Sequence, residues 1–422
     1  DKTSGNLSAI FSNYYYRYKS MADGMKYLWK SNMQSYQLKY DVDYAFSNML
    51  HIKSGLSGHT FTIMPGGIDN WGDLNNVVPY RMNRRRLLDI AAYGEISYEI
   101  SPRWQFNGGI RLSTIYSPKV STYKQKCYVM PEPRAELSYF PGKGDKLHVA
   151  FTQSSQSLHM LSNSSVGIPS DIWIPVNGRV KPAVMKQMAI GYKKNWAKGA
   201  YSFSMEAYYR KTNHIVDFVD NANIFLNNQI ESQLGFGFSK AYGAEFYFSK
   251  NVGQLTGWIS YTLSRAQNKV ATFEDNEYPP HSLKIFLNCE AGRRRRCAFA
   301  ATFSYNSGMN LTLPIAHYKT QGTSFYIYST RNGYRAPAFH QLDLSMACKL
   351  RKGRLIFSVI NVYNRKNVFT MYTSRSEFSF RDLEIHKMVH YLLFPINSSF
   401  SWLGLLRMRS MFFVLLYELL ND

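Results

Sequence analysis

The sequence predicts an all-β chain that forms a transmembrane, antiparallel, up-and-down β-barrel. Three observations lead to this prediction. Extended runs alternate apolar and polar residues, and the connections between runs are alternately short and long. The third is composition: the 422 residues are 16% aromatic, with a mean hydropathy of −0.31. Barrels combine polarity with many rings because only half of each strand contacts lipid, while aromatic residues gather at the two membrane interfaces.

The run LDIAAYGEISYEI, from Leu88 to Ile100, illustrates the alternation. Leu88 and Ile90 share one parity, whereas Asp89 and Glu95 share the other. A period of two residues is that of a strand with one apolar and one polar face. Carboxylates would be costly in a dry protein core, but a water-filled lumen solvates them. We therefore expect one face of each strand to contact lipid and the other to contact water.

The alternation predicts about sixteen strands, with boundaries good to a few residues. They are expected at 5–17, 35–47, 49–63, 86–100, 103–115, 130–140, 146–155, 183–195, 199–211, 238–249, 255–265, 280–291, 295–306, 339–350, 353–373 and 388–402. Long connections are expected at 18–34, 64–85, 116–129, 156–182, 212–237, 266–279, 307–338 and 374–387. Because they occupy every second connection, they should form one functional surface outside the cell, with the short turns on the periplasmic side.

Aromatic and guanidinium groups in the long connections are candidates for ligand contact, because they stack on and hydrogen-bond to polar ligands. The connection 307–338 carries several tyrosines and arginines, and 156–182 carries His159, Asp171, Trp173 and Arg179. The candidates chosen for ligand contact are Trp173, Tyr318, Tyr326, Arg331 and Arg335. The alternative is that these side chains pack the loops against one another.

The net charge of +22 raises the possibility of nucleic-acid binding. However, the basic residues are scattered through connectors, as at 84–86 and 293–296, and no recognisable binding module gathers them. Arginines such as Arg84, Arg85 and Arg86 are interpreted as a solvated rim or as partners for anionic lipid head groups. We expect no nucleic-acid partner.

The cysteines and histidines predict no metal site, and no cofactor is expected. The four cysteines lack C-x-x-C spacing. Cys289 and Cys297 share the apolar parity on facing strands and could be neighbours, or they could be small residues facing lipid. His386 and His390 have the spacing of a helical zinc pair, but their surroundings predict a loop entering a strand. There is no G-x-S-x-G motif and no Ser/His/Asp set that the strand register would bring together, so no catalytic residues and no enzyme activity are expected.

Several segments resemble one family. The stretch from Pro133 holds a Q-x-L-H run (QSLH), then D-x-W (DIW) and K-P in a long loop; "YNSGMNLTLP" begins at Tyr305, "RNGYRAPAFHQLDLS" at Arg331, "VINVYNRKN" at Val359 and "YLLFPINSSFSW" at Tyr391. In this order they resemble the barrel of TonB-dependent outer-membrane receptors. The resemblance covers most of the chain from about residue 86 onward.

The resemblance implies a ligand-gated nutrient importer of the bacterial outer membrane. In that family an N-terminal plug fills a barrel of about 22 strands, and the TonB machinery pulls on a short box before the plug. The implied partners are outer-membrane lipid and lipopolysaccharide, the TonB machinery through a plug and box not present in this chain, and a small-molecule or oligomeric nutrient. That nutrient could be a metal chelate, a vitamin, a peptide or a glycan.

The chain departs from the family pattern at both ends. It opens at Asp1 without an initiator Met, signal peptide, plug or TonB box. We therefore expect residues 1–402 to be the C-terminal portion of a longer receptor barrel, either truncated or one product of a split gene. Residues 403–422 form an atypical apolar extension, either an interfacial amphipathic helix or frameshifted translation. A porin-like channel or a barrel adhesin is the alternative function, and an outer-membrane barrel enzyme is a third.

Overall fold

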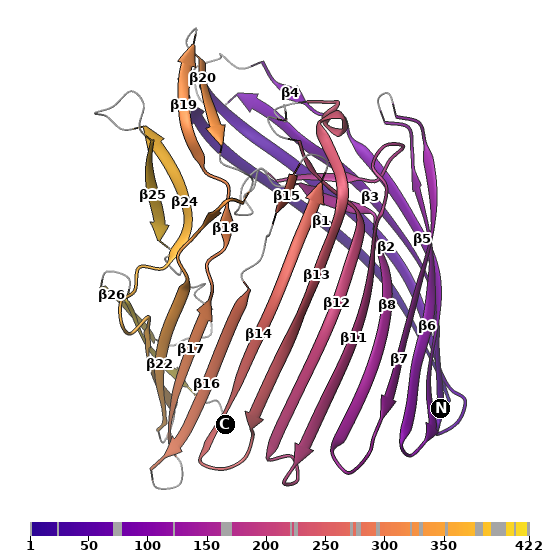
Figure 1. Ribbon diagram of the computed structural model, residues 1–422, viewed down its shortest axis with the longest axis vertical. Coiled ribbons are helices and arrows are strands. Elements are labelled where there is room, and N and C mark those ends of the chain that lie inside the picture. The colour runs from indigo at the N-terminus through magenta and orange to yellow at the C-terminus, as the bar shows by residue number, and fades with distance from the viewer. Residues whose placement is uncertain are drawn as a thin grey trace.

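The protein is a curved antiparallel sheet with long connections at one end and short turns at the other (Figure 1). The computed structural model describes residues 2–22, 25–70, 78–120, 123–161, 171–219, 222, 227–270, 273–275, 280–292, 296–320, 323–328, 332–350, 353–375, 383–389, 402–408 and 411–419. Among these residues no helix has the length and apolar character needed to cross a bilayer.

A 19-stranded sheet forms the wall. Along the wall each strand pairs with the next in the order β1 (Thr3–Ala22), β2 (Met25–Ala45), β3 (Leu50–Asn70), β5 (Arg85–Ser101), β6 (Trp104–Ser117), β7 (Lys126–Tyr139), β8 (Asp145–Gln156), β11 (Ala183–Trp196), β12 (Tyr201–Phe218), β13 (Leu234–Lys250), β14 (Leu255–Val270), β16 (His281–Ala291), β17 (Cys297–Asn306), β22 (Phe339–Lys349), β23 (Gly353–Ile360), β27 (Met411–Leu419) and β26 (Trp402–Met408). The short strands β4 (Tyr80–Arg81) and β15 (Phe273–Asp275) add to β3 and β14.

The long connections contain further small elements. Four two-stranded sheets pair β9 (Leu158–Leu161) with β10 (Ile172–Pro175), β18 (Asn310–Leu311) with β21 (Tyr334–Arg335), β19 (Pro314–Thr320) with β20 (Thr323–Tyr328), and β24 (Val368–Arg375) with β25 (Leu383–Val389). A 3-10 turn, η1, covers Ile230–Gln233. These elements lie at the end of the wall opposite the short turns.

The predicted fold class is confirmed, and the first fourteen predicted strands match wall strands to within a few residues, apart from extensions into the long connections. The largest difference is at the predicted loop 18–34, because β1 continues to Ala22 and β2 already begins at Met25. The sequence Asp23–Gly24 between them is a common hairpin turn dipeptide, and the prediction missed it. At 20 and 21 residues, β1 and β2 are about twice as long as a bilayer requires, so they project beyond it.

The C-terminal predictions were less accurate. The predicted strand 353–373 ends early at Ile360, and Val368–Arg375 belongs to a separate hairpin. Of the predicted strand 388–402, residues 390–401 lie outside the described part of the chain. The extension after Trp402 forms β26 and β27, and β27 pairs with β23, so of the two alternatives for 403–422 the interfacial helix does not match these strands. Frameshifted translation stays a prediction. His386 lies on strand β25, which agrees with the expectation that its surroundings are not a helix, and His390 lies outside the described residues.

The outer face of the wall is apolar. Leu56, Met188 and Ile190 are 62%, 64% and 58% exposed, far more than water-facing apolar side chains of a stable soluble sheet would be. Aromatic residues gather on this face near the short turns, where Trp104 contacts Tyr139 and Trp196 stacks on Tyr201, with centroids 4.6 and 5.5 Å apart. An apolar band bordered by rings is the outer surface of a membrane barrel.

The inner face carries polar side chains that meet across glycines. Tyr93 donates a hydrogen bond to Asp41 on the far side of Gly55, and His148 Nε2 lies 3.1 Å from Glu206 on the far side of Gly191. A Cβ at Gly55 or Gly191 would clash with the Tyr93 hydroxyl or the His148 ring. Glycine in the middle strand therefore lets side chains two strands apart pair inside the lumen.

The cysteine pairing differs from the prediction. Because the hairpin between β16 and β17 pairs Ala291 with Cys297, Cys289 lies opposite Phe299 instead. Cys297 lies directly opposite Cys348 of β22, and these two form a disulfide. Cys289 and Cys127 are free and exposed.

Candidate functional site

Three long connections pack together at the long-loop end of the wall. Their apolar side chains form one buried cluster of Met82, Leu161, Ile172, Ile174, Val180, Phe218, Ile230 and Leu234. We call this assembly, residues 82–85, 158–161, 171–180, 218–219, 222 and 227–234, the loop cluster. Its members come from three connections: the one between β3 and β5, the one between β8 and β11, and the one between β12 and β13. Distant parts of the sequence therefore pack together in one compact body.

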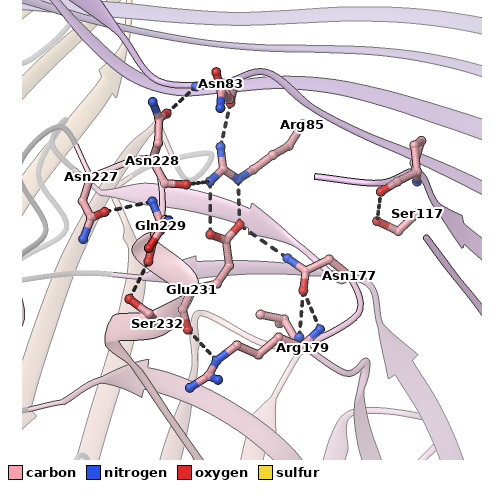
Figure 2. Close-up of polar contacts among 12 residues, drawn as sticks. Asn83, Arg85, Ser117, Asn177, Arg179, Asn227, Asn228, Gln229, Glu231 and Ser232 are labelled. Carbon is pink, nitrogen blue, oxygen red and sulfur yellow. Dashed lines mark hydrogen bonds and ion pairs between the residues drawn. The ribbon is translucent and has the colours of Figure 1, made fainter. Parts of the chain in front are cut away.

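A buried ion pair lies at the centre of the loop cluster (Figure 2). Arg85 at the start of β5 donates from Nε to Glu231 Oε1 at 2.9 Å and from NH2 to Oε2 at 3.2 Å, and both side chains are fully buried. The remaining guanidinium donors reach the carbonyl oxygens of Asn83 and Asn228 at 2.6 and 3.3 Å. Because each buried charge is paired and hydrogen-bonded, the desolvation cost of the pair is offset.

The third connection joins this centre through Asn177. Its Oδ1 accepts hydrogen bonds from the backbone N–H groups of Arg179 and Val180, at 2.8 and 2.9 Å, which fixes a tight turn. Its Nδ2 lies 3.4 Å from Glu231 Oε1, and Arg179 Nε donates to the Glu231 carbonyl oxygen at 2.8 Å. Figure 2 shows that these contacts converge on Glu231 from two loops.

The loop cluster is attached to the inner face of the wall. Val176 packs in a buried group with Leu87 of β5 and Ile115 of β6, and the Tyr128 hydroxyl donates to the Asn177 carbonyl oxygen at 2.7 Å. Within β9, His159 is buried and its Nε2 lies 3.2 Å from the Lys181 carbonyl oxygen. Burial lowers the pKa of His159 below its ordinary value of 6.5, so this imidazole is neutral at pH 7.

Two cavities line the wall. One, of about 690 Å³, lies among inner-face residues of β2 to β8 that include Asp43, Lys53, Glu95 and Arg134. The other, of about 700 Å³, lies beneath β18 and β21 and is lined by residues that include Tyr208, Ser264, Arg265, Asn310 and Arg335. Both volumes are in the range of small-molecule sites. The second cavity combines phenol and guanidinium groups that suit a polar or anionic ligand.

The structure places the predicted ligand residues in different surroundings. Trp173 is half-buried on β10, one residue from each of the buried Ile172 and Ile174. Tyr318 pairs with Phe325 and Tyr326 with His317, on adjacent rungs of the β19–β20 hairpin. Arg331 lies outside the described residues, and Arg335 is exposed and lines the second cavity. Arg335 is thus placed at a cavity, whereas Trp173 lies at the edge of the loop cluster.

Sequence reasoning missed the centre of the loop cluster. Arg85 was interpreted as part of a solvated rim, but it is fully buried, while its neighbours Arg84 and Arg86 are exposed. The alternation along β5 places Arg85 on the inner face, where Glu231 is available. Strand parity could have indicated the inner face, because Arg85 shares the parity of Leu87 and Asp89. Its partner Glu231, however, is 146 residues away, and no local pattern identifies it.

Comparison with known proteins agrees with this geometry. The chain matches the family described as TonB dependent receptor-like, beta-barrel, over residues 2–364. It resembles the ferripyoverdine receptor of the Pseudomonas aeruginosa outer membrane (10% identity, TM-score 0.65), the ferric yersiniabactin uptake receptor FyuA from Yersinia pestis (11%, 0.65) and the ferric-catecholate import receptor Fiu from K12 E. coli (12%, 0.62). These alignments cover 99% of this chain and 54%, 59% and 62% of those chains.

The chain therefore spans about half to three fifths of the length of the solved receptors it resembles. No curated protein matches it significantly. At these identities the solved structures establish the fold, whereas the family match covers most of the sequence directly. The family consists of transport receptors of the bacterial outer membrane rather than enzymes. The chain belongs to the TonB-dependent receptor-like β-barrel family.

Proposed function

We propose that this chain supplies the wall and extracellular loops of an outer-membrane receptor that takes up a nutrient and is driven by TonB. The observation that carries the proposal is the family match over residues 2–364 together with a two-faced wall, apolar outside and charged inside. In this arrangement the loops meet the ligand first and the polar lumen offers a solvated path inward. The chain performs no covalent step.

A polar, anionic nutrient such as a metal chelate fits the residues best. The cavity beneath β18 and β21 is lined by Arg335 and by Tyr208 of the inner face. Guanidinium groups bind carboxylates bidentately, and phenols add stacking and hydrogen bonds. The named substrates of FyuA, Fiu and the ferripyoverdine receptor are iron chelates, which supports this ligand class as a proposal for this chain.

The wall also requires further strands. Among the described residues β1 and β26 each pair on one side only, and unpaired backbone groups in lipid cost several kcal/mol each. We propose that a preceding part of the same receptor, or a separately encoded part, covers these edges. Sequencing the DNA upstream of Asp1 tests this, and an in-frame start codon with a signal peptide directly beside Asp1 would refute it.

Gene deletion tests uptake. Loss of the gene should abolish growth on one nutrient source, and a plasmid copy should restore it only when TonB and the proton gradient are intact. Uptake that persists without TonB would instead indicate a passive porin-like channel, and surface binding without uptake would indicate an adhesin. Single-channel recording separates the same alternatives, because a gated receptor is closed at rest.

The ligand contacts are tested by substitution. Arg335→Ala should raise the ligand concentration for half-maximal uptake about tenfold, the effect of losing one charged hydrogen bond. Trp173→Ala should have a smaller effect, because Trp173 lies at the edge of the loop cluster. Arg103→Ala, an exposed arginine at a short turn, is the matched control and should leave uptake unchanged.

A further inference from the structure

The short turns, at the lower end of the wall in Figure 1, carry five exposed cations. These are Lys143 in the turn between β7 and β8, Lys193 and Lys198 at the turn between β11 and β12, Arg296 directly before β17, and Lys349 at the end of β22. We call these five residues the basic rim. The sequence places further cations between the same strands, because residues 293–295 are arginines and residues 351–352 are Arg-Lys.

Backbone hydrogen bonds fix the positions of these cations and leave their side chains in solvent. In the turn between β11 and β12, the Gly199 N–H donates to the Trp196 carbonyl oxygen at 3.1 Å, with Lys198 at the apex. The Lys349 N–H donates to the Arg296 carbonyl oxygen at 2.8 Å, so these two cations lie side by side. The turns therefore hold the charges in place at the end of the wall.

Strand parity shows that Lys193 and Lys349 do not face lipid. Along β11, Met188 is 64% exposed on the outer face, and Lys193 has the opposite parity. Along β22, Leu344 is 42% exposed on the outer face, and Lys349 likewise has the opposite parity. The outward positions at this end hold rings such as Trp196. Rings therefore face the lipid interface, whereas these lysines face the opening of the lumen and the solution beyond it.

Within the part of the chain that the structure describes, no carboxylate forms an ion pair with any member of the basic rim. Neighbouring cations differ in this respect. Lys194 Nζ lies 3.5 Å from Asp145, and the strand register places Arg354 opposite Glu418. The chain thus supplies carboxylates to the cations beside the basic rim and leaves the rim itself to an external anion.

The spacing of the basic rim indicates an extended partner. Neighbouring strands lie about 4.8 Å apart, so successive short turns are about 10 Å apart and the rim extends about 40 Å along the wall. Compact protein interfaces are enriched in aromatic residues and Arg and depleted of Lys, whereas four of the five rim residues are lysines. Lysines are flexible, hydrated point charges that suit a diffuse attraction. A long polymer with repeated negative charges can contact all of them at once.

We propose that the basic rim binds peptidoglycan through the carboxylates of its peptide stems. This inference rests on the proposed outer-membrane location, in which the short turns lie in the periplasm beside this polyanionic polymer. Each cation contacts a different carboxylate, because a spacing of about 10 Å is close to the screening length at 0.1 M salt. Many weak contacts hold the receptor to the cell wall, while the loop cluster at the other end stays free to meet the ligand. No covalent step is involved.

Co-sedimentation with purified peptidoglycan sacculi tests the proposal without depending on transport. The full chain, extracted from outer membranes in a nonionic detergent, would be pelleted with increasing amounts of sacculi. The wild type should bind, and Lys143→Gln/Lys193→Gln/Lys198→Gln should need about tenfold more sacculi for half-maximal binding, at about twofold for each exposed ion pair lost. In about 1 M NaCl the screening length falls to about 3 Å, so the wild type should then bind no better than this variant.

A matched triple variant controls for net charge. Lys186→Gln/Lys211→Gln/Lys240→Gln removes the same charge from exposed positions at the long-loop end and should bind sacculi as the wild type does. Sacculi whose carboxylates have been converted to amides should bind neither the wild type nor the variants. Heat-modifiable migration on gels confirms that each variant is folded.

Three outcomes would overturn the proposal. Equal losses in both triple variants would show an effect of net charge alone, and equal binding of amidated and native sacculi would show that carboxylates are not recognised. A rim variant that loses binding to phosphatidylglycerol vesicles but keeps binding to sacculi would assign the basic rim to lipid. Absence of TonB-dependent uptake with intact binding to sacculi would count against the proposed function alone.

Discussion

In the wall, Met188 and Ile190 are exposed on the outer face, whereas in the loop cluster Arg85 and Glu231 are completely buried. The wall repeats one pattern, with apolar residues outward and polar residues inward. The surroundings of each side chain are therefore set mainly by its position along its own strand. The loop cluster has no repeat, and its centre depends on residues 146 positions apart. The wall should therefore tolerate many substitutions that keep the alternation of apolar and polar residues, whereas single substitutions should destabilise the loop cluster.

The largest effect should follow from breaking the buried ion pair. Arg85→Met leaves the Glu231 carboxylate buried without its cation and should destabilise the loop cluster by about 3–5 kcal/mol. Hydrogen exchange of amides in 172–180 and 228–234 would measure the loss. Arg84→Met, at an exposed neighbour, should have no effect. Arg85→Met combined with Glu231→Leu should recover much of the protection, and a double variant as damaged as the single one would contradict this account.

A charge on the outer face should have the next largest effect. Ile190→Arg places a guanidinium near the bilayer midplane, at a cost of about 2–4 kcal/mol. Denaturant unfolding from lipid vesicles would measure it. Glu245→Arg, at an exposed inner-face position of similar depth, should cost less than about 1 kcal/mol because the lumen is wet. Similar losses in both variants would show that the two faces are not divided between lipid and water.

Removing the amide of Asn177 should have a smaller effect within the loop cluster. Asn177→Ala leaves the N–H groups of Arg179 and Val180 without their acceptor and should cost about 1–3 kcal/mol. Limited proteolysis in the 171–182 connection would detect the loosened turn. Asn83→Ala is the control, because Asn83 contributes to the ion-pair site only through its backbone carbonyl and N–H. Equal cleavage of the two variants would argue against the turn.

The smallest effect should be the pH dependence that arises from His159. Its folded-state pKa lies below 6.5, so the unfolded loop binds the proton more readily than the folded loop. The loop cluster is therefore fully stable above pH 6.5 and loses stability as the pH falls below 6.5 toward the folded-state pKa. Hydrogen exchange of β9 amides against pH should show this slope, and His159→Gln should flatten it. His51→Gln, at an exposed histidine, should leave the slope unchanged.

The sequence predicted the wall far better than the loops. For β5, the alternation from Leu88 to Ile100 set both the element and the face of each residue, because a strand imposes a fixed period of two. The continuation of β1 to Ala22 and the start of β2 at Met25 were not predicted, because the apolar alternation stops before these residues. Beyond the membrane, two paired strands need no apolar face toward lipid. The pairing of β1 with β2 therefore continues there without the alternation of apolar and polar residues.

The cysteines show why register matters. Parity correctly placed Cys289 and Cys297 on one face, but the register of β16 against β17 offsets them. The register of β17 against β22 places Cys348 opposite Cys297. The pairing depends on which strand lies beside β17 after the 307–338 connection. Nothing within either strand encodes that neighbour.

By itself, the sequence determined that this chain builds a two-faced, antiparallel wall with long connections at one end, because strand period and turn residues act over a few neighbouring positions. The tertiary structure decided that Arg85 is buried against Glu231, that Cys297 pairs with Cys348, and that three lysines align on the outer face. Each of these depends on the register between strands or on loops meeting across the lumen. Such contacts arise only when distant segments fold together, so no local pattern contains them.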